Sequence, residues 1–187
     1  MSRNSRQVVL ALGSNVGDRL ANLRLGVEAL IGDGIMATAV SGVFETAPVG
    51  GPEQDNYLNA VLLAESALSA HQVLARCAAA ESAAGRVRTV RWGPRTLDVD
   101  IITYNDERWA EPDLTLPHPR AHERAFVLAP WLDVDSSAVL PGQGRVADLL
   151  AAISMAGVWR CPDLRLTLPA GDTAPPRGPA AGVTPCI

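Results

Sequence analysis

One short stretch of the chain, residues 91–102, constrains the fold more than any other. Gly93-Pro94 within it signals a turn, because proline fixes φ and cannot donate to a strand ladder. The residues after this turn are rich in β-branched and apolar side chains, which predicts a strand over 96–104. Side chains alternate between the two faces of a strand, so Asp98 and Asp100 share one face, about 6.6 Å apart along the backbone.

The residues alone leave two interpretations of this acidic pair open. Like charges this close repel each other unless a cation neutralises them. A divalent metal site is one solution, and Mg²⁺ is favoured because carboxylates are hard oxygen ligands. The alternative is a structural network in which Arg91 and Arg95 neutralise both carboxylates, since a short Asp-x-Asp pattern often occurs by chance.

The charge pattern narrows the classes of ligand. The chain has 187 residues and a net charge of −4, which argues against a general nucleic-acid or membrane binder. All 16 basic residues are arginine, and several of them fall between positions 86 and 124. An acidic protein with a local arginine cluster suggests a small anionic ligand, because guanidinium binds phosphate through two parallel hydrogen bonds.

Length, cysteine usage and apolar runs set the expected organisation. We expect one domain over residues 1–168, long enough for a hydrophobic core, and a disordered tail over 169–187 that is rich in Pro, Gly and Ala. Three cysteines without CxxC spacing indicate neither a zinc site nor a disulfide framework. The apolar run Val8–Leu12 is too short for a signal peptide or a membrane span, so the cytoplasm is the expected compartment.

Hydrophobic periodicity predicts alternating strands and helices along the chain. The expected strands cover 7–12, 35–45, 57–65 and 96–104, and the expected helices cover about 19–31, 70–84, 121–132 and 146–153. Ser69 and Gln72 form a capping box at the start of the second helix. Gly13-Ser14-Asn15 ends the first strand in a turn that lacks the Gly-Lys-Ser/Thr pattern of a phosphate loop.

Three polar residues lie where this pattern does not expect them. Glu81 falls inside the apolar stripe of its helix, so its carboxylate needs a partner, either an arginine of the segment that follows or a ligand. Asn59 lies in a strand that is apolar on both faces, and a hydrogen bond to a neighbouring loop is its structural explanation. His118 stands between two prolines in a rigid loop and is not expected in the core.

Six motifs then occur in order at compatible spacings. They are Gly13-Ser14-Asn15-x-Gly17-Asp18, Thr46-x-Pro48-x-Gly50, Tyr57-Leu58-Asn59-Ala60, Gly85-Arg86-x-Arg88, Arg91-Trp92-Gly93-Pro94-Arg95-Thr96-Leu97-Asp98-x-Asp100-Ile101, and Pro117-His118-Pro119-Arg120 with Arg124-x-Phe126. In these motifs, over about residues 7–153, the chain resembles the 6-hydroxymethyl-7,8-dihydropterin pyrophosphokinase family of folate biosynthesis. Members of that family move a diphosphate from ATP to a pterin alcohol.

This resemblance implies both a fold and an activity. The fold would be α+β, a ferredoxin-like antiparallel sheet with helices packed on it. The activity would be that of an ATP-dependent diphosphotransferase with two Mg²⁺ ions as cofactors, both held by Asp98 and Asp100. The partners would be the small molecules ATP and 6-hydroxymethyl-7,8-dihydropterin, and we expect a cytoplasmic monomer that binds neither nucleic acid nor membrane.

The resemblance also assigns residues to subsites. The catalytic residues would be Arg86, Arg95, Asp98 and Asp100. The ATP site would be lined by Glu81, Arg88, Trp92, Arg95, Ile101, Thr115, His118 and Arg124. The pterin would contact Thr46, Ala47, Pro48, Val49, Tyr57, Asn59 and Phe126, with Tyr57 and Phe126 stacked on opposite faces of its ring.

Two other classes of protein share parts of the pattern. Nucleotidyltransferases of the polymerase-β kind combine Gly-Ser with Asp-x-Asp, but there the two motifs lie close together, whereas Ser14 and Asp98 are far apart here. An RNA-binding module with a ferredoxin-like sheet would need exposed aromatic residues and a basic face. This chain is acidic and only 4% aromatic, which argues against that class.

Overall fold

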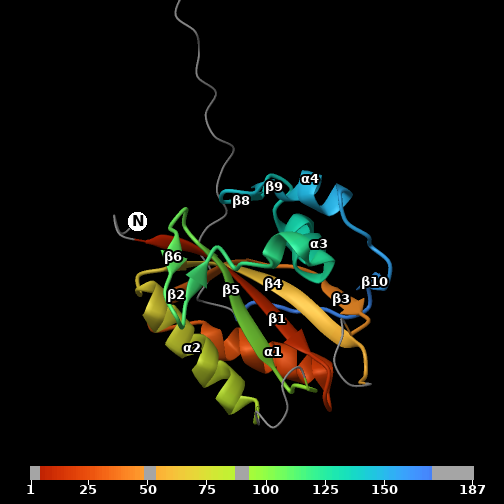
Figure 1. The fold of residues 1–187 in the computed structure, drawn as a ribbon. Helices are drawn as coiled ribbons and strands as arrows, with labels where there is room; N and C mark the ends of the chain where they lie inside the picture. Colours follow the sequence, from red (N-terminus) through yellow and green to blue (C-terminus); the bar gives the residue numbers. More distant parts are fainter. Residues whose placement is uncertain (1–4, 49–53, 87–92, 170–187) are drawn as a thin grey trace, which may run out of the picture.

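The computed structural model describes residues 5–48, 54–86 and 93–169, and its centre is an antiparallel sheet (Figure 1). Five strands follow one another in the order β10-β3-β4-β1-β5, and β2 also pairs with β4. The strands are β1 (Arg6–Ser14), β2 (Ile35–Val40), β3 (Val43–Thr46), β4 (Tyr57–Ser66), β5 (Asp98–Tyr104) and β10 (Val158–Cys161).

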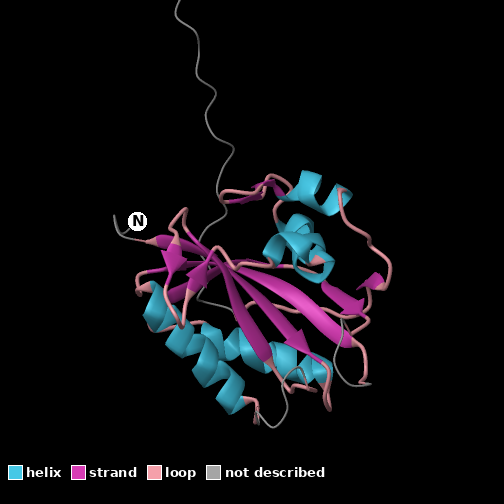
Figure 2. Ribbon diagram, viewed as in Figure 1, coloured by secondary structure: helices cyan, strands magenta, loops and turns pink. Residues whose placement is uncertain are grey.

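Helices cover both faces of this sheet (Figure 2). On one face α1 (Arg19–Leu30) and α2 (Ala70–Ala83) lie side by side, and on the other α3 (Ala125–Val134) packs on β4, with α4 (Val146–Ala151) against α3. The smaller elements are β6 (Trp109–Ala110), β7 (Thr115–Leu116), η1 (Ala121–Glu123), β8 (Val139–Leu140) and β9 (Gly144–Arg145). The α+β class with helices packed on an antiparallel sheet is therefore confirmed.

Alternation along the central strand β1 divides the core into two parts. Leu10 and Leu12 pack with α1 and α2, whereas Val9 packs with Ile102 of β5 and with α3. A strand needs apolar residues on both faces when both faces are covered. Complete burial of one leucine such as Leu10 stabilises the fold by about 1.5–3 kcal/mol.

Local capping fixes where the first two helices begin. Asp18 accepts a hydrogen bond from Ala21 N–H at 3.0 Å at the start of α1. The capping box expected at α2 is confirmed, because Ser69 N–H donates to Gln72 Oε1 at 2.8 Å and Gln72 N–H donates to Ser69 Oγ at 3.3 Å. Each bond satisfies a backbone donor that the first turn of a helix leaves unpaired.

The strand expected over 35–45 is wrong as a single element. It breaks at Ser41 and Gly42 into β2 and β3, which both pair with β4. Ser41 Oγ accepts a hydrogen bond from Val61 N–H at 2.9 Å, so the break leaves that donor of β4 satisfied.

Two boundaries near the C-terminal half also differ from expectation. The helix expected over 121–132 is the single turn η1 followed by α3, which begins at Ala125. The chain then returns to the sheet as β10, a strand that the sequence pattern did not indicate. Leu166 belongs to the same core cluster as the buried residues of α1 and α2. Of the tail expected over 169–187 only Pro169 is among the described residues. Within the described ranges no helix is both long enough and apolar enough to cross a membrane.

Candidate functional site

Two polar side chains lie in one row across three neighbouring strands, on the same face of the sheet as α3. Gly13 of β1 is the register partner of Asn59 on β4 and of Asp98 on β5. A Cβ at position 13 would lie 3.1 Å from Asn59 Oδ1, so glycine leaves the space that the amide occupies. Since neighbouring strands are about 4.8 Å apart, the row sets the backbones of Asn59 and Asp98 about 10 Å from each other.

Asp98 is paired on both of its carboxylate oxygens. Oδ1 accepts from Arg86 Nη1 at 2.6 Å, and Oδ2 accepts from Arg95 Nη1. The side chain of Asp98 is 23% exposed, and Arg86 is nearly buried. The structural network considered for the acidic pair therefore exists at Arg95, whereas Arg91 lies outside the described residues.

Glu81 closes this cluster from α2. Its side chain is buried, and Oε1 accepts from Val99 N–H at 3.0 Å and from Arg86 Nη1. Because β5 is an edge strand, its backbone needs acceptors from outside the sheet on one side. The expectation that Glu81 pairs with the arginine-rich segment is confirmed through Arg86.

Asp100 shares the face of Asp98, as strand alternation predicts, and is more open to solvent at 39% exposure. Its Oδ2 accepts from Arg124 Nη1 at 3.1 Å, just before the start of α3. His118 Nε2 lies 3.7 Å from the same oxygen. We call Glu81, Asp98 and Asp100, with their arginine partners, the acidic centre.

His118 lies beside Asp100, and a backbone hydrogen bond fixes the orientation of its ring. Burial lowers the pKa of His118, the Asp100 carboxylate opposes that shift, and the Arg124 guanidinium adds to the lowering. Because Nδ1 accepts a hydrogen bond from Arg120 N–H at 3.2 Å, the proton of the neutral ring lies on Nε2, which faces Asp100. The ring can therefore donate a hydrogen bond toward this part of the site.

The residues expected to bind the pterin lie at the other end of the row. Asn59 Nδ2 donates to Thr46 Oγ1 at 2.8 Å, and both side chains are buried. The expected structural hydrogen bond of Asn59 is therefore present, but its partner lies on strand β3 and not in a loop. Tyr57 stands next to Asn59 on the same face, and burial raises the pKa of its hydroxyl. Ala47 and Pro48 follow directly after β3.

Phe126 and Tyr57 are the two residues expected to stack on the pterin. Phe126 lies in the first turn of α3, where the Arg124 guanidinium is 5.6 Å from the centre of its ring. Among the described residues the two rings make no aromatic contact with each other.

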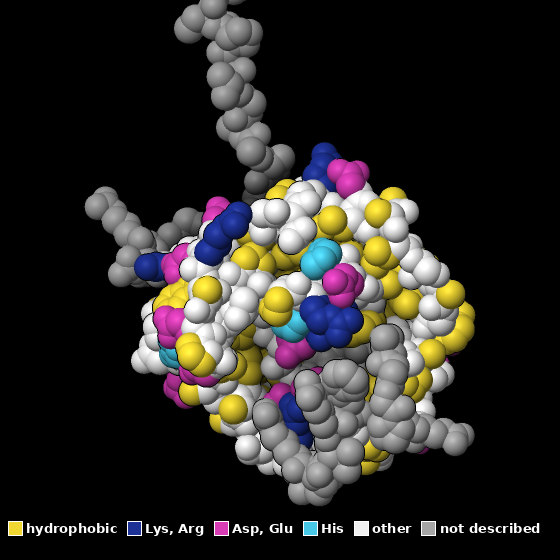
Figure 3. All heavy atoms as spheres, viewed as in Figure 1, with side chains coloured by type: hydrophobic (Ala, Val, Ile, Leu, Met, Phe, Trp, Pro, Cys, Tyr) yellow, Lys and Arg dark blue, Asp and Glu magenta, His cyan; other side chains and the backbone are white. Residues whose placement is uncertain are grey.

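The remaining expected site residues fall into two groups. Val49, Arg88 and Trp92 lie outside the described residues. Ile101 points into the core on the α1/α2 side, opposite to Asp100, so only its backbone is available to a ligand on the α3 side. Thr115 is exposed on β7, which lies against β5. Figure 3 shows acidic, basic and histidine side chains gathered near the middle of the face that it presents.

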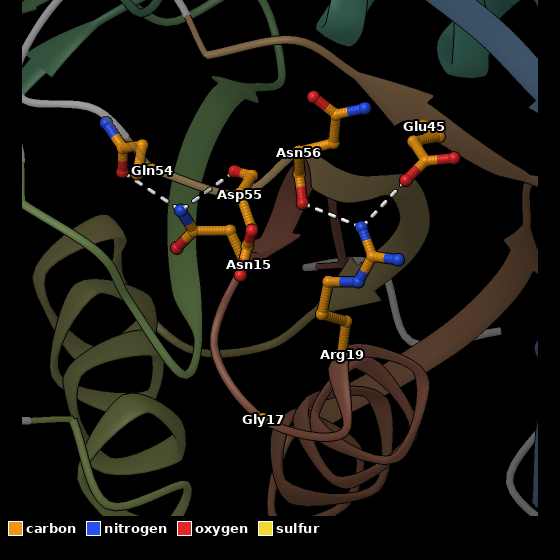
Figure 4. A pocket seen from close by; sticks show the side chains of 7 residues that line it. All are labelled: Asn15, Gly17, Arg19, Glu45, Gln54, Asp55 and Asn56. Carbon is orange, nitrogen blue, oxygen red and sulfur yellow. Dashed lines mark hydrogen bonds and ion pairs between the residues drawn. The ribbon is translucent and has the colours of Figure 1, made fainter.

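A polar pocket of about 430 Å³ lies beside the end of β1 (Figure 4). On one side of it Arg19 Nη1 donates to Glu45 Oε1 at 2.8 Å and to Asn56 O at 2.7 Å. On the other side Asn15 donates to Gln54, a polar residue to which the sequence motifs assigned no role. The sequence contained Asn15 in its Gly-Ser-Asn turn, but the pattern did not indicate that its side chain crosses to another loop.

Comparison with known proteins gives a consistent result. Residues 9–136 match the family model described as 7,8-dihydro-6-hydroxymethylpterin-pyrophosphokinase (HPPK). The 2-amino-4-hydroxy-6-hydroxymethyldihydropteridine pyrophosphokinase of Mycobacterium leprae is 49% identical over 150 residues, covering 74% of this chain and 77% of that protein. The Methylorubrum extorquens protein of the same name is 40% identical over 152 residues, covering 81% and 96%.

The fold is also shared with a solved structure. Wild-type HPPK-DHPS of Plasmodium falciparum superimposes with a TM-score of 0.60 at 11% identity, covering 79% of this chain. This chain spans 44% of that longer protein, so the match concerns the fold of one part of it. The family model and the two bacterial relatives establish that the chain belongs to the 7,8-dihydro-6-hydroxymethylpterin-pyrophosphokinase family.

Proposed function

We propose that the α3-side face of the sheet, from Asn59 to the acidic centre, binds both substrates of this family's reaction. The protein is an ATP-dependent diphosphotransferase that acts on 6-hydroxymethyl-7,8-dihydropterin in folate biosynthesis. The observation that carries the site assignment is the register of Gly13 with Asn59 and Asp98. It sets an amide suited to a heterocycle edge and a carboxylate suited to a metal–phosphate complex on one surface, with their backbones about 10 Å apart.

Asp98 and Asp100 fit a magnesium site by their donor set. Both offer carboxylate oxygens, the ligand type that Mg²⁺ prefers, and they lie on one strand face with Asp100 open to solvent. We assign two Mg²⁺ ions to these residues. When bound with ATP, such ions neutralise phosphate charge and polarise the phosphorus–oxygen bonds.

The protein's own groups position the reactants and balance charge. The pterin hydroxyl oxygen bonds to the β-phosphorus of ATP, the bond from that phosphorus to the α-phosphate oxygen breaks, and AMP leaves while the hydroxyl proton is released. Arg86, Arg95 and Arg124 surround this region, and guanidinium groups stabilise the charge on phosphate oxygens during the transfer. His118 contributes a donor on Nε2, and Asn59 and Thr46 present the hydrogen-bonding edge for the pterin.

The reaction needs no protein nucleophile, and the buried thiol next to the site is unsuited to be one. Burial, with a further contribution from the Glu81 charge, raises the pKa of Cys77 to about 12. Its thiol therefore stays protonated and unreactive at neutral pH. Direct transfer between the two bound substrates agrees with this. The monomeric state and the cytoplasmic location expected from the sequence are part of the same proposal.

A thermal-shift experiment tests the proposal against its main alternative. A ligand at one hundred times its dissociation constant stabilises a protein by about 2.7 kcal/mol. We expect melting-temperature increases with ATP only when Mg²⁺ is present, an increase with the pterin, and none with single-stranded RNA. Stabilisation by RNA together with indifference to ATP and pterin would overturn the proposal in favour of an RNA-binding module.

A further inference from the structure

Asn15, directly after β1, bonds to two segments that are far apart in the sequence. It is 3% exposed. Its backbone N–H donates to Arg95 O at 3.0 Å, and its Oδ1 accepts from Arg95 N–H at 2.7 Å. On its other side Nδ2 donates to Gln54 Oε1 at 2.9 Å and to Asp55 O at 3.2 Å (Figure 4). Both amide protons and the amide oxygen are therefore engaged between two loops.

Backbone partners fix the orientation of this amide. The N–H of Arg95 can only donate and the carbonyl of Asp55 can only accept, so Oδ1 faces the first and Nδ2 faces the second. The substitution Asn15→Asp therefore separates the two functions of the side chain. It keeps the size and the acceptor for Arg95, and it removes both bonds to the 54–55 segment.

Each of the two segments bonded to Asn15 also contacts a residue assigned to one of the two substrate subsites. The Arg95 guanidinium pairs with Asp98 in the acidic centre, where ATP is assigned. Gln54 Oε1, the acceptor for Asn15, also accepts from Tyr57 O–H at 3.1 Å, and Tyr57 is assigned to the pterin. A continuous path of side-chain and backbone bonds thus runs from the metal-binding carboxylate to the aromatic clamp through one buried amide.

We propose that Asn15 is a positioning residue that couples the two substrate subsites. The inference rests on the proposed function, because the subsites are those assigned above. A ligand that holds the Arg95 segment in place also holds Gln54 and Tyr57 through Asn15, so the second ligand meets a preorganised subsite. Because coupling between two ligands is reciprocal, ATP with Mg²⁺ tightens pterin binding by the same factor by which the pterin tightens ATP binding.

Asn22 of α1 provides a matched control, because its side-chain amide bonds to the turn that contains Asn15. Its Nδ2 donates to Ser14 Oγ at 3.2 Å and to Val16 O at 2.8 Å. Asn22→Asp is therefore the same chemical change and also removes two donated bonds, but those bonds join α1 only to the adjacent 14–16 turn. A role of Asn15 in turn stability alone would make the two variants behave alike.

The experiment measures the coupling by calorimetry on the full chain. The dissociation constant of the pterin is determined with and without a non-hydrolysable ATP analogue and Mg²⁺, and that of the analogue with and without the pterin. We expect each ligand to tighten the other about tenfold in the wild type and in Asn22→Asp. In Asn15→Asp we expect this factor to fall to within about twofold and kcat to fall about tenfold, with the affinity for the analogue alone unchanged.

A pair of substitutions at Gln54 tests the same path from the pterin side. Gln54→Met keeps the length of the side chain and removes the acceptor, so it is expected to reproduce the loss of coupling even if Asn15→Asp fails to fold. Gln54→Glu restores an acceptor oxygen and is expected to restore the coupling. Absent coupling in the wild type, or coupling retained in Gln54→Met, would overturn the inference. A wild-type protein that transfers no diphosphate would instead overturn the proposed function.

Discussion

Replacing the carboxylates of the acidic centre one at a time, by Asp98→Asn and Asp100→Asn, separates their effect on stability from their effect on catalysis. Breaking a fully buried ion pair costs about 3–5 kcal/mol. Asp98 is 23% exposed and its partner Arg86 keeps Glu81, so we expect a smaller cost of about 1–3 kcal/mol. Asp100 is 39% exposed, and loss of its pair with Arg124 is expected to cost about 0–1 kcal/mol.

If both carboxylates hold Mg²⁺, catalytic activity should fall strongly in both variants, although Asp98→Asn is expected to lose more stability than Asp100→Asn. Each substitution removes one anionic ligand, and metal stabilisation of transition-state charge is worth several kcal/mol. Since about 1.4 kcal/mol corresponds to a factor of ten in rate, both variants should lose about 10²-fold or more in kcat. Excess Mg²⁺ should recover part of this loss. The measurements are thermal unfolding and AMP release over a Mg²⁺ titration.

Asp133→Asn is a control away from the site. Asp133 is also 23% exposed, and it accepts from Arg160 at 3.0 Å and from Gly42 N–H at 2.8 Å. This variant should lose stability with an unchanged Mg²⁺ dependence. The metal assignment is wrong if Asp100→Asn keeps normal Mg²⁺-dependent turnover while only the less stable Asp98→Asn loses it. Activity would then follow stability, as arginine neutralisation alone predicts.

Three further predictions follow from other parts of the molecule. Tyr57→Ala or Phe126→Ala should weaken pterin binding by about tenfold or more, since one aromatic stack is worth about 1–3 kcal/mol. Calorimetry should show unchanged ATP binding in both variants, and an equal loss of affinity for both ligands would contradict the clamp. Cys77, with its pKa raised to about 12, should resist alkylation at pH 8 until the protein unfolds, because only about one thiol in 10⁴ is ionised. Truncation after Pro169 should leave the melting temperature and activity unchanged, whereas a truncation that also removes the buried Leu166 should cost about 1.5–3 kcal/mol.

Sequence periodicity correctly predicted which face of a strand or helix each of several polar side chains occupies. Alternation put Asp98 and Asp100 on one face, and helical periodicity put Glu81 in an apolar stripe, because both effects are set by residues a few positions apart. The break at Ser41 could not be predicted in this way. At the break Ser41 bonds to Val61, which is distant in the sequence, and the residues on both sides continue the strand pattern. The strand β10 was not predicted either, because it is formed by pairing with β3, which lies far earlier in the chain.

The sequence predicted which residues make up the site better than it predicted which of them contact one another. The motifs supplied Asp98, Asp100, Asn59 and Arg124, but no local pattern gives the strand order that sets Gly13 between Asn59 and Asp98. Pairing of Arg124 with Asp100 likewise depends on how α3 packs on the sheet. The resemblance to a family supplied these roles, whereas the structure supplies the physical relations among them.

The position of the acidic pair on an edge strand explains why a buried glutamate belongs to the same cluster. One carboxylate, Glu81, accepts from the edge backbone at Val99 and also fixes Arg86 beside Asp98. Among the described residues the acidic centre thus sets three carboxylates against three guanidinium groups and has no net charge. A centre that is already neutral gains little from an unaccompanied polyanion, because the phosphates would meet carboxylates as well as arginines. We therefore expect it to accommodate ATP when divalent ions balance the phosphate charge, which supports the proposed assignment of Mg²⁺ to Asp98 and Asp100.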